Sequence, residues 1–164
     1  MLSESTRQRV DRELAKYPAD QRQSAIIAAL SIVQQERGWV SPESERELAE
    51  YIGMPPIAVH EVVTFYNMFN TQPVGRFKLN VCTNLPCQLG GGVQALKYLS
   101  EKLGVGVGET TADGLFTLQQ TECLGACGDA PVALVNDRRM CSTMSAEKID
   151  ALLDELRAQA GGGQ

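Results

Sequence analysis

The sequence of 164 residues has little with which to bind nucleic acid or cross a membrane. Lys and Arg number 15 against 20 Asp and Glu, and the resulting net charge of −5 argues against binding to phosphate backbones or anionic lipid. The longest purely apolar stretch, Ala25 to Leu30, is far shorter than the ~20 residues of a membrane span. Glu4 and Asp11 interrupt any N-terminal targeting segment. We therefore expect an intracellular protein without nucleic acid partners or direct membrane insertion.

Histidine and nucleotide-binding motifs are also scarce. The one histidine, His60, lies in a segment rich in Val and aromatic residues, where a packing or surface role is more common than metal ligation. No nucleophile elbow accompanies it, so hydrolytic catalysis is not supported. The glycines of Gly104 to Gly108 follow a predicted helix rather than a strand and lack the G-x-G-x-x-G spacing. We expect no catalytic residue and no nucleotide site in this chain.

Hydrophobic periodicity divides the chain into two parts. Up to about Phe69 the apolar residues recur at helical spacing, and Asp20, Ser41 with Pro42, Gly38 and Gly53 mark helix ends. One apolar stripe near the end of this part is more typical of a helix face packed in the core than of a partner-docking surface. At least part of the helical half is nevertheless expected to form an interface. The expected helices lie near residues 3–16, 21–37, 42–52 and 56–68, and the stripe comprises Val59, Val62, Val63, Phe65, Tyr66 and Phe69.

The second part has a mixed pattern. Residues 76–82 alternate between apolar and polar, which predicts a half-buried strand. A helix, further strands, a turn at Asn136-Asp137 and a last helix capped by Ser145 follow. These later elements are expected at residues 93–103, 115–121, 132–135, 140–143 and from 145 onward. The fold class is therefore α/β, with a helical domain over residues 1–72, an α/β domain over residues 73–160 and a mobile tail over residues 161–164.

Five cysteines are the feature that composition leaves unexplained. Four form two clusters, Cys82 with Cys87 and Cys123 with Cys127, while Cys141 stands alone. Each cluster directly follows a predicted strand, and the two strands are joined by a helix. Because such a crossover makes parallel neighbours, the carboxyl ends of both strands meet at one edge of the sheet. The sequence thus predicts that four thiols converge there.

Several chemistries compete for these thiols. Disulfides do not suit an intracellular chain, and neither cluster has the C-x-x-C spacing of a redox dithiol. Zinc ligation stays open, because two ligands of a zinc site can be separated by up to four residues in the sequence. The four-residue spacer of the first pair matches plant-type [2Fe–2S] ferredoxins, although the three-residue second spacer does not. An all-thiolate [2Fe–2S] site is favoured, with a zinc-stabilised interaction module and a dithiol oxidoreductase as the alternatives.

The residues around the cysteines indicate a low reduction potential. Glycines beside both clusters let backbone N–H groups approach sulfur, and such hydrogen bonds tune a metal site. No Lys or Arg lies between Lys78 and Lys97, and Glu122 and Asp129 flank the second pair. Negative side chains oppose the addition of an electron, so we expect a potential toward the low end of the range.

At these residues the sequence resembles a known family. The segments Cys-Thr-Asn-Leu-Pro-Cys, Glu-Cys-Leu-Gly-Ala-Cys-Gly-Asp-Ala-Pro and Thr-Phe-Tyr-Asn-Met-Phe look like those of the thioredoxin-like [2Fe–2S] subunits of bacterial NADH-quinone oxidoreductase, respiratory complex I. The resemblance covers nearly the whole chain. It implies a helical N-terminal domain followed by a thioredoxin-like [2Fe–2S] ferredoxin domain. Its four ligands map onto Cys82, Cys87, Cys123 and Cys127, and Cys141, which matches no ligand, is interpreted as a packed thiol.

The resemblance also implies a function and partners. The chain would be an electron-transfer subunit of an NADH dehydrogenase module, exchanging single electrons with the flavin of a partner subunit. FMN and NADH would bind only to that partner, further iron–sulfur subunits would be neighbours, and the complex would lie at the cytoplasmic face of the cell membrane. The equivalent diaphorase subunit of an NAD-reducing hydrogenase or NAD-dependent formate dehydrogenase is the alternative function.

Overall fold

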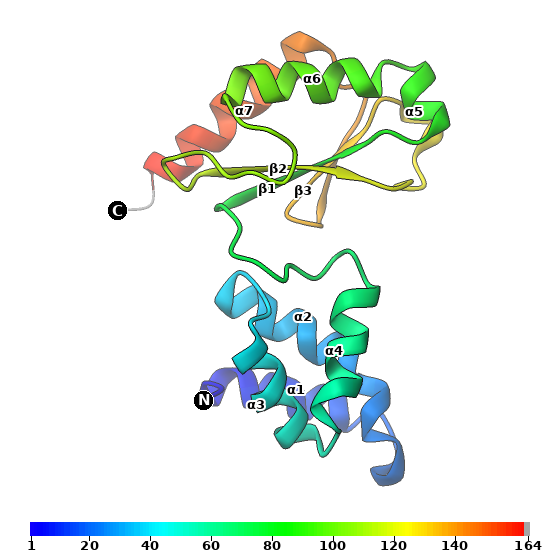
Figure 1. Ribbon diagram of the computed structural model, residues 1–164, viewed down its shortest axis with the longest axis vertical. Helices are drawn as coiled ribbons and strands as arrows, with labels where there is room; N and C mark the ends of the chain where they lie inside the picture. The colour runs from blue at the N-terminus through cyan, green and yellow to red at the C-terminus, as the bar shows by residue number, and fades with distance from the viewer. Residues whose placement is uncertain (163–164) are drawn as a thin grey trace. The chain divides into compact units, whose positions relative to one another are not determined.

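The computed structural model describes residues 1–162, and the chain divides into two compact units, Met1–Pro73 and Val74 onward (Figure 1). Each unit has a hydrophobic core of its own. Leu30 and Leu48 are fully buried in the first core, and Leu118 and Leu153 in the second. The units are therefore described separately.

The first unit is helical, as its periodicity predicts. Ser41 caps a helix by accepting a hydrogen bond from the Ser44 N–H at 3.1 Å, and Gly38 and Gly53 end helices in the left-handed conformation. These three expected helix ends are confirmed. The helices of the unit are α1 (Glu4–Leu14), the 3-10 helix η1 (Ala19–Ala25), α2 (Ile26–Arg37), α3 (Pro42–Ile52) and α4 (Pro56–Phe65).

Two helix boundaries differ from the prediction. The expected helix over 21–37 is split, because Gln21 is non-helical and the polar segment before Ala25 forms η1 rather than an α-helical turn. The expected helix over 56–68 ends at Phe65, since Tyr66 takes an extended conformation. This turn lets the chain fold back and bury Phe69 in the core of the unit. Tertiary packing thus overrides the helical spacing at both places.

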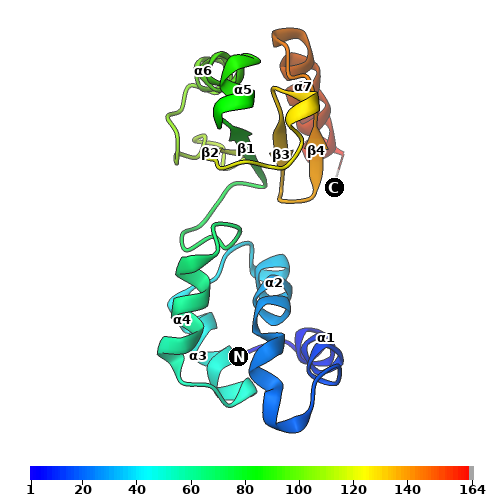
Figure 2. The same ribbon diagram turned by 90° about the vertical axis from the view of Figure 1, so that its right-hand side faces the viewer.

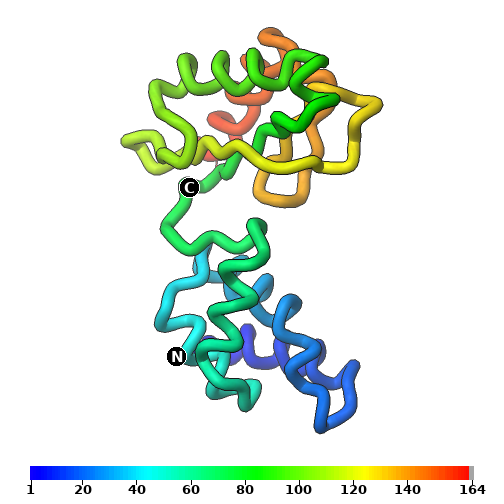
Figure 3. The backbone as a smooth tube through the Cα atoms, turned by 45° about the vertical axis from the view of Figure 1, so that its right-hand side comes forward, coloured from blue at the N-terminus to red at the C-terminus, as the bar shows by residue number. Residues whose placement is uncertain are grey.

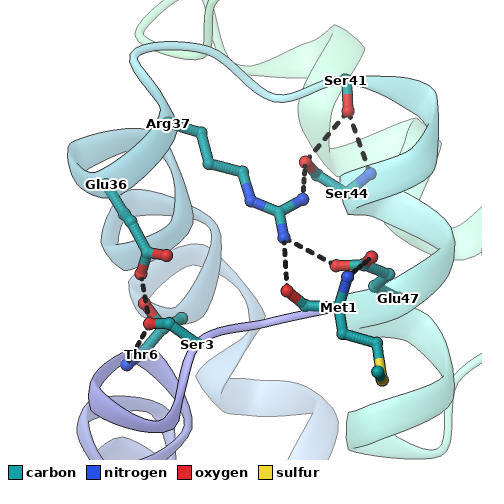
Figure 4. Close-up of polar contacts among 8 residues, drawn as sticks. All are labelled: Met1, Ser3, Thr6, Glu36, Arg37, Ser41, Ser44 and Glu47. Carbon is teal, nitrogen blue, oxygen red and sulfur yellow. Dashed lines mark hydrogen bonds and ion pairs between the residues drawn. The ribbon is translucent and has the colours of Figure 1, made fainter.

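A polar network around Arg37 connects the helices of the first unit (Figure 4). The Arg37 guanidinium donates to Ser44 Oγ at 2.7 Å, to Glu47 Oε2 at 2.8 Å and to the Met1 carbonyl oxygen at 3.1 Å. The Met1 amino group lies 2.5 Å from Glu47 Oε1. Ser3 adds a hydrogen bond to Glu36 on α2. One side chain of α2 therefore holds both α3 and the segment that leads into α1.

The second unit is an α/β layer structure. Within residues 74–162 a four-stranded sheet has the order β2-β1-β3-β4, with β1 and β2 parallel and the other two pairs antiparallel. Helices α6 and α7 cover one face of this sheet (Figures 1 and 2). The expected fold class is confirmed. The elements are β1 (Phe77–Cys82), α5 (Leu85–Leu89), α6 (Gly92–Leu103), β2 (Phe116–Thr121), η2 (Cys127–Asp129), β3 (Ala133–Val135), β4 (Arg139–Cys141) and α7 (Ala146–Gly161).

Strand β1 is fully buried, so the expectation of a half-buried strand is wrong. Lys78 is only 2% exposed, and its Nζ lies 2.6 Å from Asp137 Oδ2. Asn80 donates to the other oxygen of the same carboxylate at 2.8 Å. Asp137 and Asn136 form the expected turn, both with positive φ. Lys78 and Asn80, two polar residues of the alternating pattern, are thus buried against a carboxylate and not exposed to water.

The C-terminal end of the chain is only partly described. Gly161 is the last residue of α7, whose N-terminus is capped by Ser145 as predicted. The expected mobile tail begins at Gly161, and its residues 163–164 lie outside the described part of the chain. Among the described residues, no helix combines the length and the apolar character that a membrane crossing requires.

Candidate metal centre

The parallel pairing of β1 and β2 places the starts of the two cysteine loops next to each other. Cys82, the last residue of β1, pairs with Thr121, the last residue of β2, and Cys123 follows two residues later. The chain runs from β1 through α5 and α6 back to β2, a path that can be followed along the tube (Figure 3). The predicted meeting of both strand ends at one sheet edge is confirmed.

The first loop holds its two cysteines in the interior. Cys82 and Cys87 are both buried, and the Cys82 N–H donates to the Val132 carbonyl oxygen at 3.1 Å. Cys87 lies on α5, a five-residue helix with a proline in its first turn. The sequence pattern does not reveal α5, because five residues are too few to show helical periodicity.

Glycine at position 92 allows the first loop to close tightly. A Cβ atom there would lie 2.7 Å from the Cys82 carbonyl oxygen and 2.9 Å from the Cys87 carbonyl oxygen. Only glycine therefore fits between these two backbone groups. Gly92 thus sets how closely α6 approaches both cysteines of the loop. The glycine run Gly90 to Gly92 predicts a close backbone approach near the cysteines, but not which glycine makes it.

The second loop presents its cysteines to solvent. Cys123 Sγ and Cys127 Sγ lie 3.9 Å apart, and neither forms a disulfide. Gly125 lies between them in the left-handed conformation and directs its N–H to Cys123 Sγ at 3.4 Å. This hydrogen bond is of the kind that the flanking glycines predict.

Side chains also connect the two loops. Asn84 Nδ2 donates to Glu122 Oε2 at 2.6 Å, and Gln120 Nε2 donates to Thr83 Oγ1 at 2.7 Å. Sequence reasoning missed both contacts, because only the strand register shows which loop residues stand opposite one another. Each link joins the first cysteine loop to β2 or to the residue before Cys123, so the two loops are tied to each other.

The thiols influence one another's protonation. Burial raises the pKa of Cys87 above its ordinary value, and the neighbouring thiols Cys82 and Cys127 raise it further, against a lowering hydrogen bond from the Val132 backbone. The pKa of Cys127 is raised chiefly by Cys123, with a smaller contribution from Cys82. The ionisable neighbours that raise both pKa values are thus other thiols, and each opposes the ionisation of the next.

The arrangement is two pairs of thiols rather than a single compact group. Within residues 1–162 no three His, Cys, Asp or Glu side chains surround one point closely enough to hold a single metal ion. The 3.9 Å separation of Cys123 and Cys127 is that of two sulfurs on one tetrahedral metal, for which bonds of about 2.3 Å give about 3.8 Å. A [2Fe–2S] cluster takes two thiolates on each of its irons. The donor set fits that group better than one zinc ion.

Cys141 and His60, whose residue types can also bind metals, belong to other elements than these loops. Cys141 is on β4, packs against the core of the second unit, and has a pKa raised by burial. His60 lies on α4 in the first unit, where its Nδ1 is 2.9 Å from Glu45 Oε2. The structure therefore places the two cysteine loops at neighbouring strand ends, Cys141 on a different strand of the same unit, and His60 in the other unit.

Comparison with known proteins identifies the family. The model of the family "Thioredoxin-like [2Fe-2S] ferredoxin" matches residues 10–157. NADH-quinone oxidoreductase subunit 2 of Thermus thermophilus is 43% identical over 149 residues, which cover 91% of this chain and 82% of the relative. An NADH-quinone oxidoreductase subunit of Rhizobium meliloti is 43% identical over 152 residues, covering 93% of this chain and 89% of the relative.

A solved structure is similar as well. A chain of an NAD⁺-reducing [NiFe]-hydrogenase in the H₂-reduced state superposes with a TM-score of 0.70 at 27% identity. The match covers 82% of this chain but only 22% of that longer chain. The resemblance that the cysteine motifs suggest is confirmed, and with it the [2Fe–2S] cofactor that the family carries. The chain belongs to the thioredoxin-like [2Fe–2S] ferredoxin family.

Proposed function

We propose that the chain is the electron-transfer subunit of the NADH dehydrogenase module of an NADH-quinone oxidoreductase. The observation that carries this proposal is the pairing of two adjacent parallel strands whose ends lead into the two cysteine loops, in a chain that matches such subunits over nearly its full length. Cys82, Cys87, Cys123 and Cys127 are the proposed ligands of one [2Fe–2S] cluster. When bound, this group accepts and releases one electron at a time.

The residues of the chain hold the ligands and exclude water from part of the site. Cys82 and Cys87 lie in a small apolar cluster with Val132, which shields their side of the site from solvent. Gly125 directs its N–H to Cys123 Sγ, and a donor at sulfur favours the thiolate. In our proposal no residue of this chain performs hydride chemistry. NADH oxidation and the FMN that splits the electron pair belong to a partner subunit.

An exposed apolar surface beside the proposed ligands supports contact with that partner. Leu85 and Leu89 on α5 are 67% and 82% exposed, and Val93 on α6 is also exposed. Contiguous exposed apolar side chains are a mark of interaction sites. In the proposed complex this surface faces the flavin-bearing subunit, with further iron–sulfur subunits beyond it, and the assembly lies at the cytoplasmic face of the cell membrane through its other subunits.

The equivalent diaphorase subunit of an NAD-reducing hydrogenase or an NAD-dependent formate dehydrogenase is the second candidate. The superposition on a chain of an NAD⁺-reducing [NiFe]-hydrogenase favours it. The whole-length relatives at higher identity favour the quinone oxidoreductase. Both candidates place the same cofactor on the same four cysteines, so they differ in the partners and not in the site.

Anaerobic purification from the native host tests the proposal. We expect about two irons and two sulfides per chain, and a rhombic electron paramagnetic resonance signal after reduction with dithionite. Mass spectrometry of the co-purifying subunits separates the two candidates. A colourless protein that contains zinc, or one that reduces insulin disulfides, would contradict the proposal.

A further inference from the structure

A groove between α1 and α2 in the first unit has a composition that the proposed function does not use. The two helices pack against each other, and a hollow of about 580 Å³ lies along their seam. The groove is lined by Arg9, Arg12 and Glu13 of α1, by Lys16 just after that helix, and by Ala28, Ser31, Ile32 and Gln35 of α2. The residues of α2 are spaced i, i+3, i+4, i+7, so one continuous face of that helix borders the groove.

The α1 side of the groove is positively charged in a chain whose net charge is −5. Lys16 is neutralised by Glu13 at 2.6 Å. Among the ion pairs of residues 1–162, none involves Arg9 or Arg12. Arg9 donates instead to the neutral amide of Gln35, and Arg12 to a backbone carbonyl of its own helix. Two guanidinium groups thus border the groove without forming an ion pair to a carboxylate of the described residues.

The α2 side is small and partly apolar. Ala28 offers little bulk, and Ile32 lies at the base of the groove with most of its surface buried. Ser31 and Gln35 add polar groups on the same face. A third helix can approach α2 closely beside the small residues Ala28 and Ser31, and an apolar residue of that helix would cover Ala28. Guanidinium groups bind carboxylates in a bidentate manner, so acidic residues on that helix would meet Arg9 and Arg12.

We propose that the α1–α2 groove binds an acidic amphipathic helix of a partner subunit. The proposal rests on the proposed function, because it assumes that the chain works inside a complex. Charge complementarity decides the occupant. The groove has two guanidinium groups without carboxylate partners beside apolar residues of α2. An occupant that complements it therefore has carboxylates and apolar residues on one face of a helix. A second copy of this chain and an anionic membrane surface are the competing occupants.

Charge reversal tests the groove in the full-length chain co-expressed with its flavin-bearing subunit. The double variant Arg9→Glu/Arg12→Glu should weaken association by about tenfold or more, and the loss should shrink at high salt. The matched control is Arg46→Glu/Arg138→Glu, which reverses two exposed charges outside both the groove and the apolar surface of α5 and α6, and should leave association unchanged. Thermal melting of both variants must match the unaltered protein, so that the comparison reports binding and not folding.

A photo-crosslinker identifies the occupant. With p-benzoylphenylalanine in place of Ser31, crosslinked peptides should come from an acidic helical segment of another subunit, whereas the same group at Lys97 should not capture that segment. Crosslinks confined to a second copy of this chain, or Arg9-dependent binding of the full chain to phosphatidylglycerol vesicles without a subunit crosslink, would overturn the proposal. So would equal association of the double variant and the control.

Iron and sulfide analysis separates this proposal from the function on which it rests. If the unaltered protein holds the cluster and assembles, but the groove variants assemble equally well, only the groove proposal fails. If the unaltered protein lacks the cluster, the proposed function itself fails.

Discussion

Gly92 lies against Cys82 so closely that a single added methyl group would meet the Cys82 carbonyl oxygen at 2.7 Å. The contact is with backbone, which cannot swing away as a flexible side chain can. The start of α6 is therefore fixed relative to the end of β1 by the absence of a side chain.

Replacement of this glycine should affect both stability and the metal site. Gly92→Ala should lower the free energy of unfolding by about 1–3 kcal/mol, because either α6 or the Cys82 loop must move. Iron content per chain should fall with it. Gly161→Ala is the control, since a Cβ there meets nothing within 4 Å. Equal stability and iron content in both variants would show that the loop adapts.

The four clustered cysteines should differ sharply from the fifth. Each of four single substitutions by serine should reduce the iron content from about two per chain and weaken or remove the visible absorption of the protein. The four positions are Cys82, Cys87, Cys123 and Cys127. Cys141→Ser should keep both, because Cys141 lies on β4 against the core. Iron analysis and visible spectra of five single variants check this, and loss of iron in Cys141→Ser would contradict the ligand assignment.

The charge of Glu122 should lower the reduction potential. Its carboxylate accepts a hydrogen bond from Asn84 between the two cysteine pairs, next to Cys123. Because a negative charge opposes the addition of an electron, Glu122→Gln should shift the midpoint potential upward. Glu101→Gln, on the exposed surface of α6, should not. A redox titration followed by electron paramagnetic resonance measures both, and a clearly positive midpoint in the unaltered protein would refute the expected low potential.

The Lys78–Asp137 pair should contribute to the stability of the second unit. Asp137→Ala removes a carboxylate that contacts both buried Lys78 and Asn80, and should lower the free energy of unfolding by about 2–3 kcal/mol. Asp137→Asn keeps a residue that tolerates the positive φ of the turn, so it separates loss of charge from backbone strain. Urea unfolding of both variants measures how much the charge and the backbone conformation of Asp137 each contribute to stability. Identical unfolding curves for Asp137→Ala and the unaltered protein would show that neither contributes.

Glu47 predicts a pH dependence in the first unit. A hydrogen bond from the Met1 amino group, aided by Arg37, lowers the pKa of Glu47 below its ordinary value. A carboxylate with a lowered folded-state pKa adds stability above about pH 4.3, and this stability disappears as the pH falls through the lowered value. Glu47→Gln should therefore cost about 1 kcal/mol at pH 7 and progressively less between about pH 5 and 3. Thermal melts across this range should converge at the acid end.

The sequence predicts the position of the two cysteine loops better than it predicts the burial of strand β1. The position of two cysteine pairs after two strands joined by a helix leads to a shared sheet edge through general rules of chain connection, and β1 and β2 obey those rules. The burial of Lys78 and Asn80 does not follow from any local pattern. It depends on Asp137, which is more than fifty residues away along the chain and reaches β1 only after the hairpin has folded.

Short elements account for most other differences. Helix α5 and the 3-10 helices η1 and η2 are too brief for periodicity to reveal, and the end of α4 depends on the burial of Phe69. The apolar stripe of α4 shows the same limit, since Val59 and Val63 are buried while Phe65 is 79% exposed. Spacing along a helix shows which residues share a face, but the neighbouring helices determine how wide the buried part of that face is.

The hairpin turn also extends the pairing of a strand that is very short by itself. Strand β3 has three residues, but Asn136 adds to its ladder, because its N–H donates to the Lys78 carbonyl oxygen and its Oδ1 accepts from the Lys78 N–H. At the other end of the same ladder, the Val132 carbonyl oxygen accepts from Cys82. A slip of one residue would turn every side chain of the strand to the opposite face. Asn136 therefore fixes the register between β3 and β1. A polar turn at one end of the sheet thus determines the position of the Cys82 thiol at the other end.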